Sequence, residues 1–154
     1  MFINILLPYK EKFSTNKASS VSLTVANNLE FSKYKKQIRI FGHNVENPMY
    51  KKNFIGIDNS WNFLQSKNQN LSDKMCEFIN KENKKFQIIE IHNRPYLVNS
   101  IYLNLKSNVT NEREYSRFLG IYNSSIDTMF TLHDSILNLS NLIAADRQFI
   151  YSKG

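Results

Sequence analysis

Glycine is scarce in this sequence, and its scarcity limits the nucleotide sites that the chain can form. Only four glycines occur among 154 residues. The phosphate-binding loops of dinucleotide-binding and P-loop proteins need glycines at fixed spacing, because the backbone must approach the phosphates closely. Neither GxGxxG nor GxxxxGK followed by Ser or Thr occurs in the chain. We therefore expect no cofactor to be bound by this chain itself.

Cysteine is nearly absent, which excludes a disulfide framework and weakens the case for a cysteine nucleophile. The single Cys76 lies on the apolar stripe of an expected helix, and no motif of a reactive cysteine surrounds it. A small buried hydrophobic side chain is the favoured interpretation, and a nucleophile is the alternative. His, Cys, Asp and Glu are not clustered at the spacing of metal ligands, so the sequence predicts no metal site.

Long hydrophobic runs are also missing. The first residues are apolar, but Asn4 interrupts them, Pro8 ends them, and no basic segment precedes them, so they are typical of a buried strand and not of a signal peptide. No apolar stretch approaches the roughly eighteen residues that a membrane span requires. We expect a cytoplasmic location, with peripheral membrane contact as a further possibility.

Charge of one sign is in excess. The formal net charge is +7, with twenty Lys and Arg against thirteen Asp and Glu. Such an excess favours anionic partners, which are nucleic acid, a phosphorylated substrate or an acidic membrane face. A solvated basic surface without a dedicated partner is the plainer interpretation. No motif interleaves basic residues with aromatics at fixed spacing, so a nucleic-acid partner is the less favoured of the three.

The order of apolar patterns predicts an α/β protein. We expect strands over residues 2–7, 37–41, 86–92, 128–133 and 147–152, with a further short strand near 54–57 inside an irregular connection from 45 to 70. We expect helices over 20–32, from Ser72 or Asp73 to about 80, over 96–105 and over 112–122. No linker or repeat divides residues 1–154. The fold expected is therefore one Rossmann-like, doubly wound domain with a mostly parallel sheet and helices on both faces.

Polar residues that end or follow the expected strands are the candidate binding residues. His92 and Arg94 come at the end of one strand, and His133 with Asp134 comes at the end of another. In a parallel sheet these strand ends share one edge, where ligands collect. A hydrogen-bonded strand end is the alternative for each histidine, and capping of local carbonyls is the alternative for Arg94.

Two further candidates lie in the loop after the first strand. Glu11 and Lys12 are placed above the same edge, although a solvated loop is the plainer interpretation of both. No residue stands out as catalytic.

Four sequence blocks, taken in order, resemble the N-terminal domain of bacterial family-four glycosyltransferases, which are retaining enzymes of the two-domain GT-B architecture. The blocks are Ile5-Leu-Leu-Pro-Tyr-Lys-Glu-Lys-Phe-Ser with Val21-Ser-Leu-Thr-Val, then Ile89-Glu-Ile-His-Asn-Arg-Pro, then Phe130-Thr-Leu-His-Asp, and finally Asp146-Arg-Gln-Phe-Ile-Tyr-Ser-Lys. The third is similar to a family strand that ends in a Leu-His-Asn-Asp type of turn. The chain departs from the family pattern at Lys17-Ala-Ser-Ser, where family members usually carry glycine.

The resemblance implies a function that this chain performs only in part. It implies a domain that binds a glycan or lipid-linked acceptor, with His92 or His133 in contact with the acceptor or the transferred sugar. The nucleotide-sugar donor is expected only with the missing C-terminal domain, which could be a separate chain. Whether the 154 residues form an enzyme stays open, and we expect no turnover from them alone. The alternative is a basic, non-enzymatic module that binds nucleic acid or another polyanion.

Overall fold

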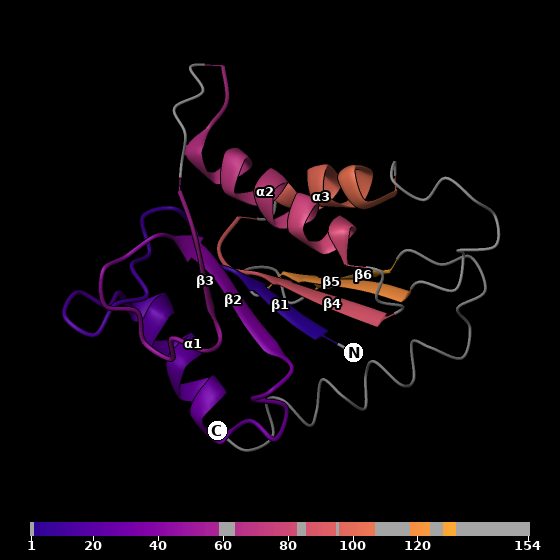
Figure 1. The fold of residues 1–154 in the computed structure, drawn as a ribbon. Helices are drawn as coiled ribbons and strands as arrows, with labels where there is room; N and C mark the ends of the chain where they lie inside the picture. Colours follow the sequence, from indigo (N-terminus) through magenta and orange to yellow (C-terminus); the bar gives the residue numbers. More distant parts are fainter. Residues whose placement is uncertain are drawn as a thin grey trace.

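The first strand lies in the centre of a six-stranded sheet. In a computed structural model, which describes residues 2–58, 64–82, 86–94, 96–106, 118–123 and 128–131, the strand order is β3-β2-β1-β4-β5-β6 (Figure 1). The strands are β1 (Phe2–Leu6), β2 (Ile38–His43), β3 (Phe54–Ile57), β4 (Phe86–Ile91), β5 (Phe118–Asn123) and β6 (Thr128–Thr131). All neighbouring pairs are parallel except β5 with β6, which is antiparallel. The expected α/β fold with a mostly parallel, doubly wound sheet is confirmed.

Within the described residues, three helices cover the two faces of the sheet. They are α1 (Ser20–Phe31), α2 (Lys67–Lys81) and α3 (Leu97–Lys106). Figure 1 shows α2 and α3 side by side on one face and α1 on the other. Two apolar clusters, one on each face, hold these layers together. The cluster under α1 contains Ile3, Ile5, Leu7, Phe13, Val25, Ala26, Leu29, Ile38 and Ile40. The cluster under α2 and α3 contains Leu6, Phe41, Ile57, Leu71, Met75, Cys76, Ile79, Ile89, Ile91, Leu97, Val98, Ile101 and Leu105.

Strand β1 is apolar on both faces because helices cover both. Successive side chains of a strand point to opposite faces, so Ile3 and Ile5 pack under α1, whereas Leu6 packs under α2 and α3. Ile3 is paired with Ile38 of β2 on one side and with Ile88 of β4 on the other. A continuous apolar run is therefore the pattern that this position requires.

Serine caps begin two of the helices, and one of them corrects an expected boundary. Ser19 accepts a hydrogen bond from the backbone N–H of Ser22 at 3.3 Å, in line with the expected start of α1. The start expected for α2 at Ser72 or Asp73 is wrong, because Ser66 caps the helix and accepts from Gln69 N–H at 3.1 Å. Ser72 is fully buried inside the helix. The polar first turn carries no apolar stripe, so it conceals the true start.

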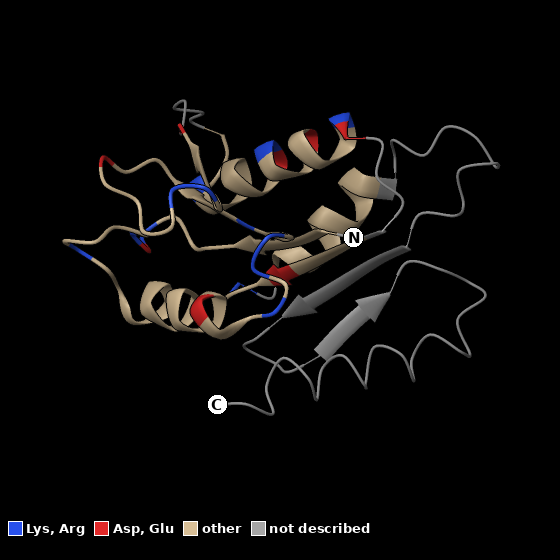
Figure 2. Ribbon diagram, turned by 60° about the horizontal axis from the view of Figure 1, so that its bottom comes forward, with Lys and Arg blue, Asp and Glu red and all other residues tan. Residues whose placement is uncertain are grey.

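The helices differ in the charges they carry. Figure 2 shows basic and acidic residues along α2, whereas α1 has a single acidic residue near its end, followed by basic residues in the next connection. That residue is Glu30. The outer surface of α1 is therefore almost uncharged.

The helix expected over residues 112–122 is wrong over its second half. Residues 118–123 form β5, which pairs in parallel with β4 from Phe86↔Phe118 to Ile91↔Asn123. Gly120 is unfavourable inside a helix, and the aromatic and β-branched residues around it favour a strand with a partner on both sides. Residues 112–117 lie outside the described residues, as does the strand expected over 147–152.

The strand expected from residue 128 is present, but its direction differs from the expectation. Strand β6 runs antiparallel to β5, so it ends at the amino-terminal edge of the parallel strands and not at the edge where β4 ends. The premise that the ends of β4 and β6 share one edge is therefore wrong.

Within the described part of the chain, no helix is long and apolar enough to cross a membrane.

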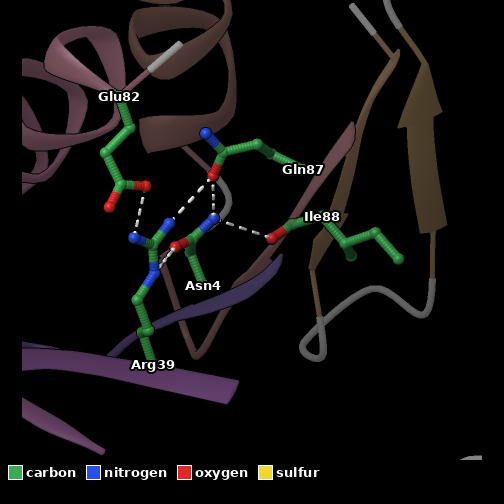
Figure 3. Close-up of polar contacts among 5 residues, drawn as sticks. All are labelled: Asn4, Arg39, Glu82, Gln87 and Ile88. Carbon is green, nitrogen blue, oxygen red and sulfur yellow. Dashed lines mark hydrogen bonds and ion pairs between the residues drawn. The ribbon is translucent and has the colours of Figure 1, made fainter. Parts of the chain in front are cut away.

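A buried polar network joins the three central strands at their amino-terminal edge (Figure 3). Arg39 of β2 donates from Nε to Asn4 Oδ1 of β1 at 2.9 Å and from Nη2 to Gln87 Oε1 of β4 at 3.0 Å. Its Nη1 pairs with Glu82 Oε2, directly after α2, at 2.5 Å. Asn4 Nδ2 in turn donates to Gln87 Oε1 at 2.8 Å. Because each buried group has a partner, the network fixes the strand register without an unpaired charge.

Loss of Arg39 should destabilise the protein more than loss of the Glu82 charge. Arg39→Met leaves Asn4 Oδ1, which is fully buried, without its donor, so we expect the free energy of unfolding to fall by about 2–4 kcal/mol. Glu82→Gln keeps an acceptor for Arg39 at a partly exposed position and should cost less than about 1 kcal/mol. Urea denaturation followed by circular dichroism measures both. Equal losses would contradict a network centred on Arg39.

The core under α2 and α3 should tolerate truncation poorly. Ile89 of β4 has no exposed surface, so Ile89→Ala leaves a cavity and should lower the free energy of unfolding by about 3 kcal/mol. The matched control is Leu103→Ala on the outer side of α3, where the side chain is 61% exposed, and its effect should stay within about 0.5 kcal/mol. The same urea experiment compares them, and a small effect of Ile89→Ala would contradict the packing described.

Candidate functional site

The chain reverses its direction of winding between β1 and β4, at the carboxyl edge of the sheet. β1 is followed by α1 on one face, and its neighbour β4 is followed by α3 on the other. The connections after the two strands therefore separate, and open parallel sheets bind ligands in the crevice that forms at such a point. The segments that follow β1 and β4 are the candidate site.

On the β1 side, Tyr9 organises a group of polar and aromatic residues. The Tyr9 N–H donates to Asn68 Oδ1 of α2 at 2.7 Å, and the Tyr9 ring lies 4.7 Å from the His43 ring at the end of β2. Lys67 Nζ lies 4.6 Å from the centroid of the Tyr9 ring. Asn68 Nδ2 donates to the Tyr96 hydroxyl at 3.3 Å. We call these five residues the Tyr9 cluster.

On the β4 side, His92 is buried and held in place. Its backbone N–H donates to Leu6 O of β1 at 3.3 Å, which ties the two strand ends together. Its Nε2 lies 2.8 Å from Glu90 Oε1. Glu90 precedes His92 by two positions in an extended chain, so both side chains lie on the face of the sheet that carries α1. The contact has the distance of an ion pair but not the geometry of a hydrogen bond, so it places a carboxylate beside the imidazole without fixing the ring.

The chain turns sharply directly after His92. Asn93 has a φ of 52°, in the left-handed region that asparagine tolerates better than most residues. Arg94 Nη1 donates to Asn93 O at 2.5 Å. Arg94 therefore bonds a local carbonyl, as its alternative interpretation predicted, and this bond leaves other donors of its planar fork for a ligand.

The first loop contains the other two described candidates. Lys12 is exposed, in line with a solvated loop, whereas Glu11 is half-buried. Glu11 Oε2 is fully buried and has no hydrogen-bond partner among the described residues. His43 Nδ1, at the end of β2, is likewise buried without a described partner. Buried polar atoms without partners are unusual, and a bound ligand is one way to satisfy them. His133 and Asp134 lie outside the described residues.

The structure thus places four of the six candidate residues in the segments that follow β1 and β4 at this edge: Glu11, Lys12, His92 and Arg94. Sequence reasoning did not single out the Tyr9 cluster, although Tyr9 directly follows the proline that ends the first strand. Asn68 and Lys67 could not be found from the sequence, because they belong to the polar first turn of α2, which was expected to be an irregular connection.

The chemistry of these residues suits a neutral or weakly anionic polar ligand. Aromatic rings, amides and hydroxyls dominate the edge, and basic side chains from the first loop, α2 and Arg94 surround it. Within the described ranges, no group of three or more His, Cys, Asp or Glu is placed to hold a metal ion.

Comparison with known proteins assigns no family to this arrangement. No protein-family model matches the chain, and neither the curated proteins nor the solved structures contain a significant match.

Cys76 has the properties of a core residue and should be unreactive in the folded protein. It is 2% exposed, and burial, followed by the nearby charges of Asp73 and Glu77, raises the pKa of its thiol to about 12. At pH 8 we expect it to react with a disulfide reagent about a thousandfold more slowly than an exposed cysteine introduced as Leu103→Cys in a Cys76→Ala background. The absorbance of the released thiolate measures both rates.

The same shift predicts how stability depends on pH. The thiol pKa is higher in the folded chain than in the unfolded one. The contribution of the thiol to the free energy of unfolding is therefore complete below about pH 8.5 and is lost as the pH rises toward the folded pKa. Removal of the thiol in Cys76→Ala should therefore flatten the decline of the free energy of unfolding at alkaline pH. In the labelling experiment, rapid reaction of Cys76 with the disulfide reagent in the folded protein would contradict its burial.

Proposed function

We propose that this chain is the acceptor-binding domain of a glycosyltransferase, and that it holds a saccharide at the carboxyl edge of the sheet between β1 and β4. One observation carries the proposal. The winding reverses between these two neighbouring strands, and the segments that follow them bring the Tyr9 cluster and the Glu90–His92 pair to the same edge. The order of the sequence blocks that resemble the family supports the choice of ligand class.

The residues at this edge match what a sugar requires. The exposed Tyr96 ring offers a flat apolar surface for the C–H face of a pyranose, and the Tyr9 ring positions His43 and Lys67 against it. The side chains of Asn68 and Asn93 can exchange hydrogen bonds with the sugar hydroxyls. Glu90 lies beside His92, whose imidazole could accept or donate a proton at an acceptor hydroxyl. Sites of this kind combine a few placed polar groups with apolar walls.

In this proposal the domain positions the acceptor and does not bind the donor. Transfer requires that the leaving diphosphate be neutralised while the acceptor hydroxyl is aligned with the sugar. The first loop has none of the glycines that allow the backbone to approach a diphosphate closely. The nucleotide sugar would therefore be held by a partner domain, and residues 1–154 alone would bind acceptor without turnover.

A titration followed by ¹⁵N nuclear magnetic resonance tests the proposal. The probes are glucose, galactose, N-acetylglucosamine and their disaccharides, with UDP-glucose as the donor probe. We expect at least one saccharide to shift the amide signals of Tyr9–Lys12 and of His92–Arg94, and to leave those near Arg39, at the opposite edge, unchanged. UDP-glucose should cause no larger shifts than its sugar alone.

Two variants and a matched control locate the binding. Tyr9→Leu and His92→Gln should each raise the dissociation constant of the bound saccharide about tenfold, because each removes contacts worth roughly 1–2 kcal/mol. Lys36→Ala, an exposed lysine at the amino edge, should leave it unchanged. Absence of any saccharide binding, or tighter binding of the nucleotide portion than of sugars, would refute the proposal.

A further inference from the structure

Two connections of the chain meet at the amino-terminal edge of β2 and β3, on the side of α1. One joins α1 to β2, and the other leads into β3. Asn53 Nδ2 donates to Lys35 O at 2.6 Å and to Ile38 O at 2.8 Å, and the Ile40 N–H donates to Asn53 O at 2.8 Å. These bonds hold the two connections side by side, although they are separated in the sequence.

The two connections together carry a group of lysines. We call it the amino-edge lysine patch, and its members are Lys33, Lys35, Lys36, Lys51 and Lys52. All but Lys35 are exposed. The acidic residue beside them is Glu30, whose pKa is lowered by hydrogen bonds from Tyr50 and Lys35. Glu30 is thus already paired within the surface, and the patch keeps a strong positive excess.

The backbone that presents two of these lysines is held in a defined conformation. Tyr50 has a φ of 48°, which is unfavourable for an aromatic residue. Its hydroxyl donates to Glu30, and its carbonyl accepts from Asn53 N–H at 2.8 Å and from Phe54 N–H at 3.2 Å. Because these contacts fix the turn, Lys51 and Lys52 need little ordering to act together with the lysines after α1.

An exposed aromatic residue adjoins the patch. Phe31, the last residue of α1, is 84% exposed, and Leu23 on the same helix is 49% exposed. The outer residues of α1 between them are Thr, Asn and Glu30, so the helix presents almost no charge until the lysines that follow it (Figure 2). A large exposed aromatic side chain beside several lysines is the composition of interfacial membrane-binding segments.

We propose that the amino-edge lysine patch, together with Phe31, docks the protein on an anionic phospholipid surface. The lysines would lie at the level of the lipid headgroups, and Phe31 would enter the boundary between headgroups and acyl chains. A nucleic-acid partner fits less well. Within the two connections the basic residues are all lysine, whereas base and phosphate recognition favours the planar fork of arginine.

Docking through the patch would leave the candidate site facing the aqueous side. The patch and the candidate site lie at opposite edges of the parallel sheet, so docking through the amino edge directs the carboxyl edge away from the lipid. The acceptor group would then be reached from the aqueous side. Docking does not depend on the proposed saccharide site, because no residue is shared between the two surfaces.

Co-sedimentation with lipid vesicles tests the docking. The probes are vesicles of phosphatidylcholine alone and vesicles that contain about one-third phosphatidylserine. We expect binding only to the anionic vesicles, with a steep decrease as salt is added. Lys36→Glu together with Lys52→Glu, one residue from each connection, should weaken partitioning on the order of a hundredfold.

Matched controls separate the patch from the overall charge. Lys10→Glu together with Lys81→Glu changes two exposed lysines elsewhere and lowers the net charge equally, so it should weaken partitioning by less than about threefold. Phe31→Ala should weaken it about tenfold, whereas Leu103→Ala, also exposed but on α3, should not. Each position changed is at the surface, so circular dichroism should confirm an intact fold.

Three outcomes would overturn the proposal. They are absence of binding to anionic vesicles by the unaltered protein, equal losses in the two double variants, and preferential binding of a single-stranded oligonucleotide that Lys36→Glu with Lys52→Glu removes. Saccharide binding is measured separately on the same variants. Failure of docking with intact saccharide binding, or the reverse, therefore shows which of the two proposals is wrong.

Discussion

The parallel pairing of β1 with both β2 and β4 is the constraint on which the other features depend. It places an apolar strand between two neighbours, so that helices must cover both faces, and it makes the winding reverse between β1 and β4. The same pairing places Asn4 level with Arg39 and brings Gln87, which is level with Phe2, within hydrogen-bond distance of both, so that these bonds fix the register. A shift of one residue would move every apolar side chain to the wrong face and would also break these hydrogen bonds.

The two edges of the sheet have different physical characters. At the amino edge the central strands are closed by a satisfied polar network, and the surface beside α1 is basic. At the carboxyl edge the connections separate, aromatic and amide side chains gather around Tyr9, and Glu11 and His43 keep buried polar atoms without partners among the described residues. Such atoms are not confined to this edge, because Gln37 Oε1 directly before β2 and Asn70 Oδ1 and Ser72 Oγ in α2 have no described partner either. The separation of the connections and the aromatic and amide side chains therefore support the ligand at the carboxyl edge, and the lysines support docking at the other.

Much of the fold could be predicted from short-range patterns. The apolar run of β1, the strand at β4 and the serine cap of α1 each have a local signal, because burial and capping act on neighbouring residues. The errors have a common origin in long-range contacts. β5 was expected to be helical because its pairing with β4 is not visible in the chain, and α2 was expected to begin too late because its first turn packs through Asn68 against Tyr9. The direction of β6 likewise depends on its partner strand.

By itself, the sequence determined the class of the fold, the absence of glycine-rich phosphate loops and the position of His92 and Arg94 at a strand end. These follow from composition and local periodicity, which need no knowledge of distant residues. The tertiary structure alone decided that Tyr9 joins His43 and Lys67, and that lysines from two connections form one surface. These contacts join elements that the chain separates by many residues, and only the packing of the sheet and its helices brings them within reach of one another.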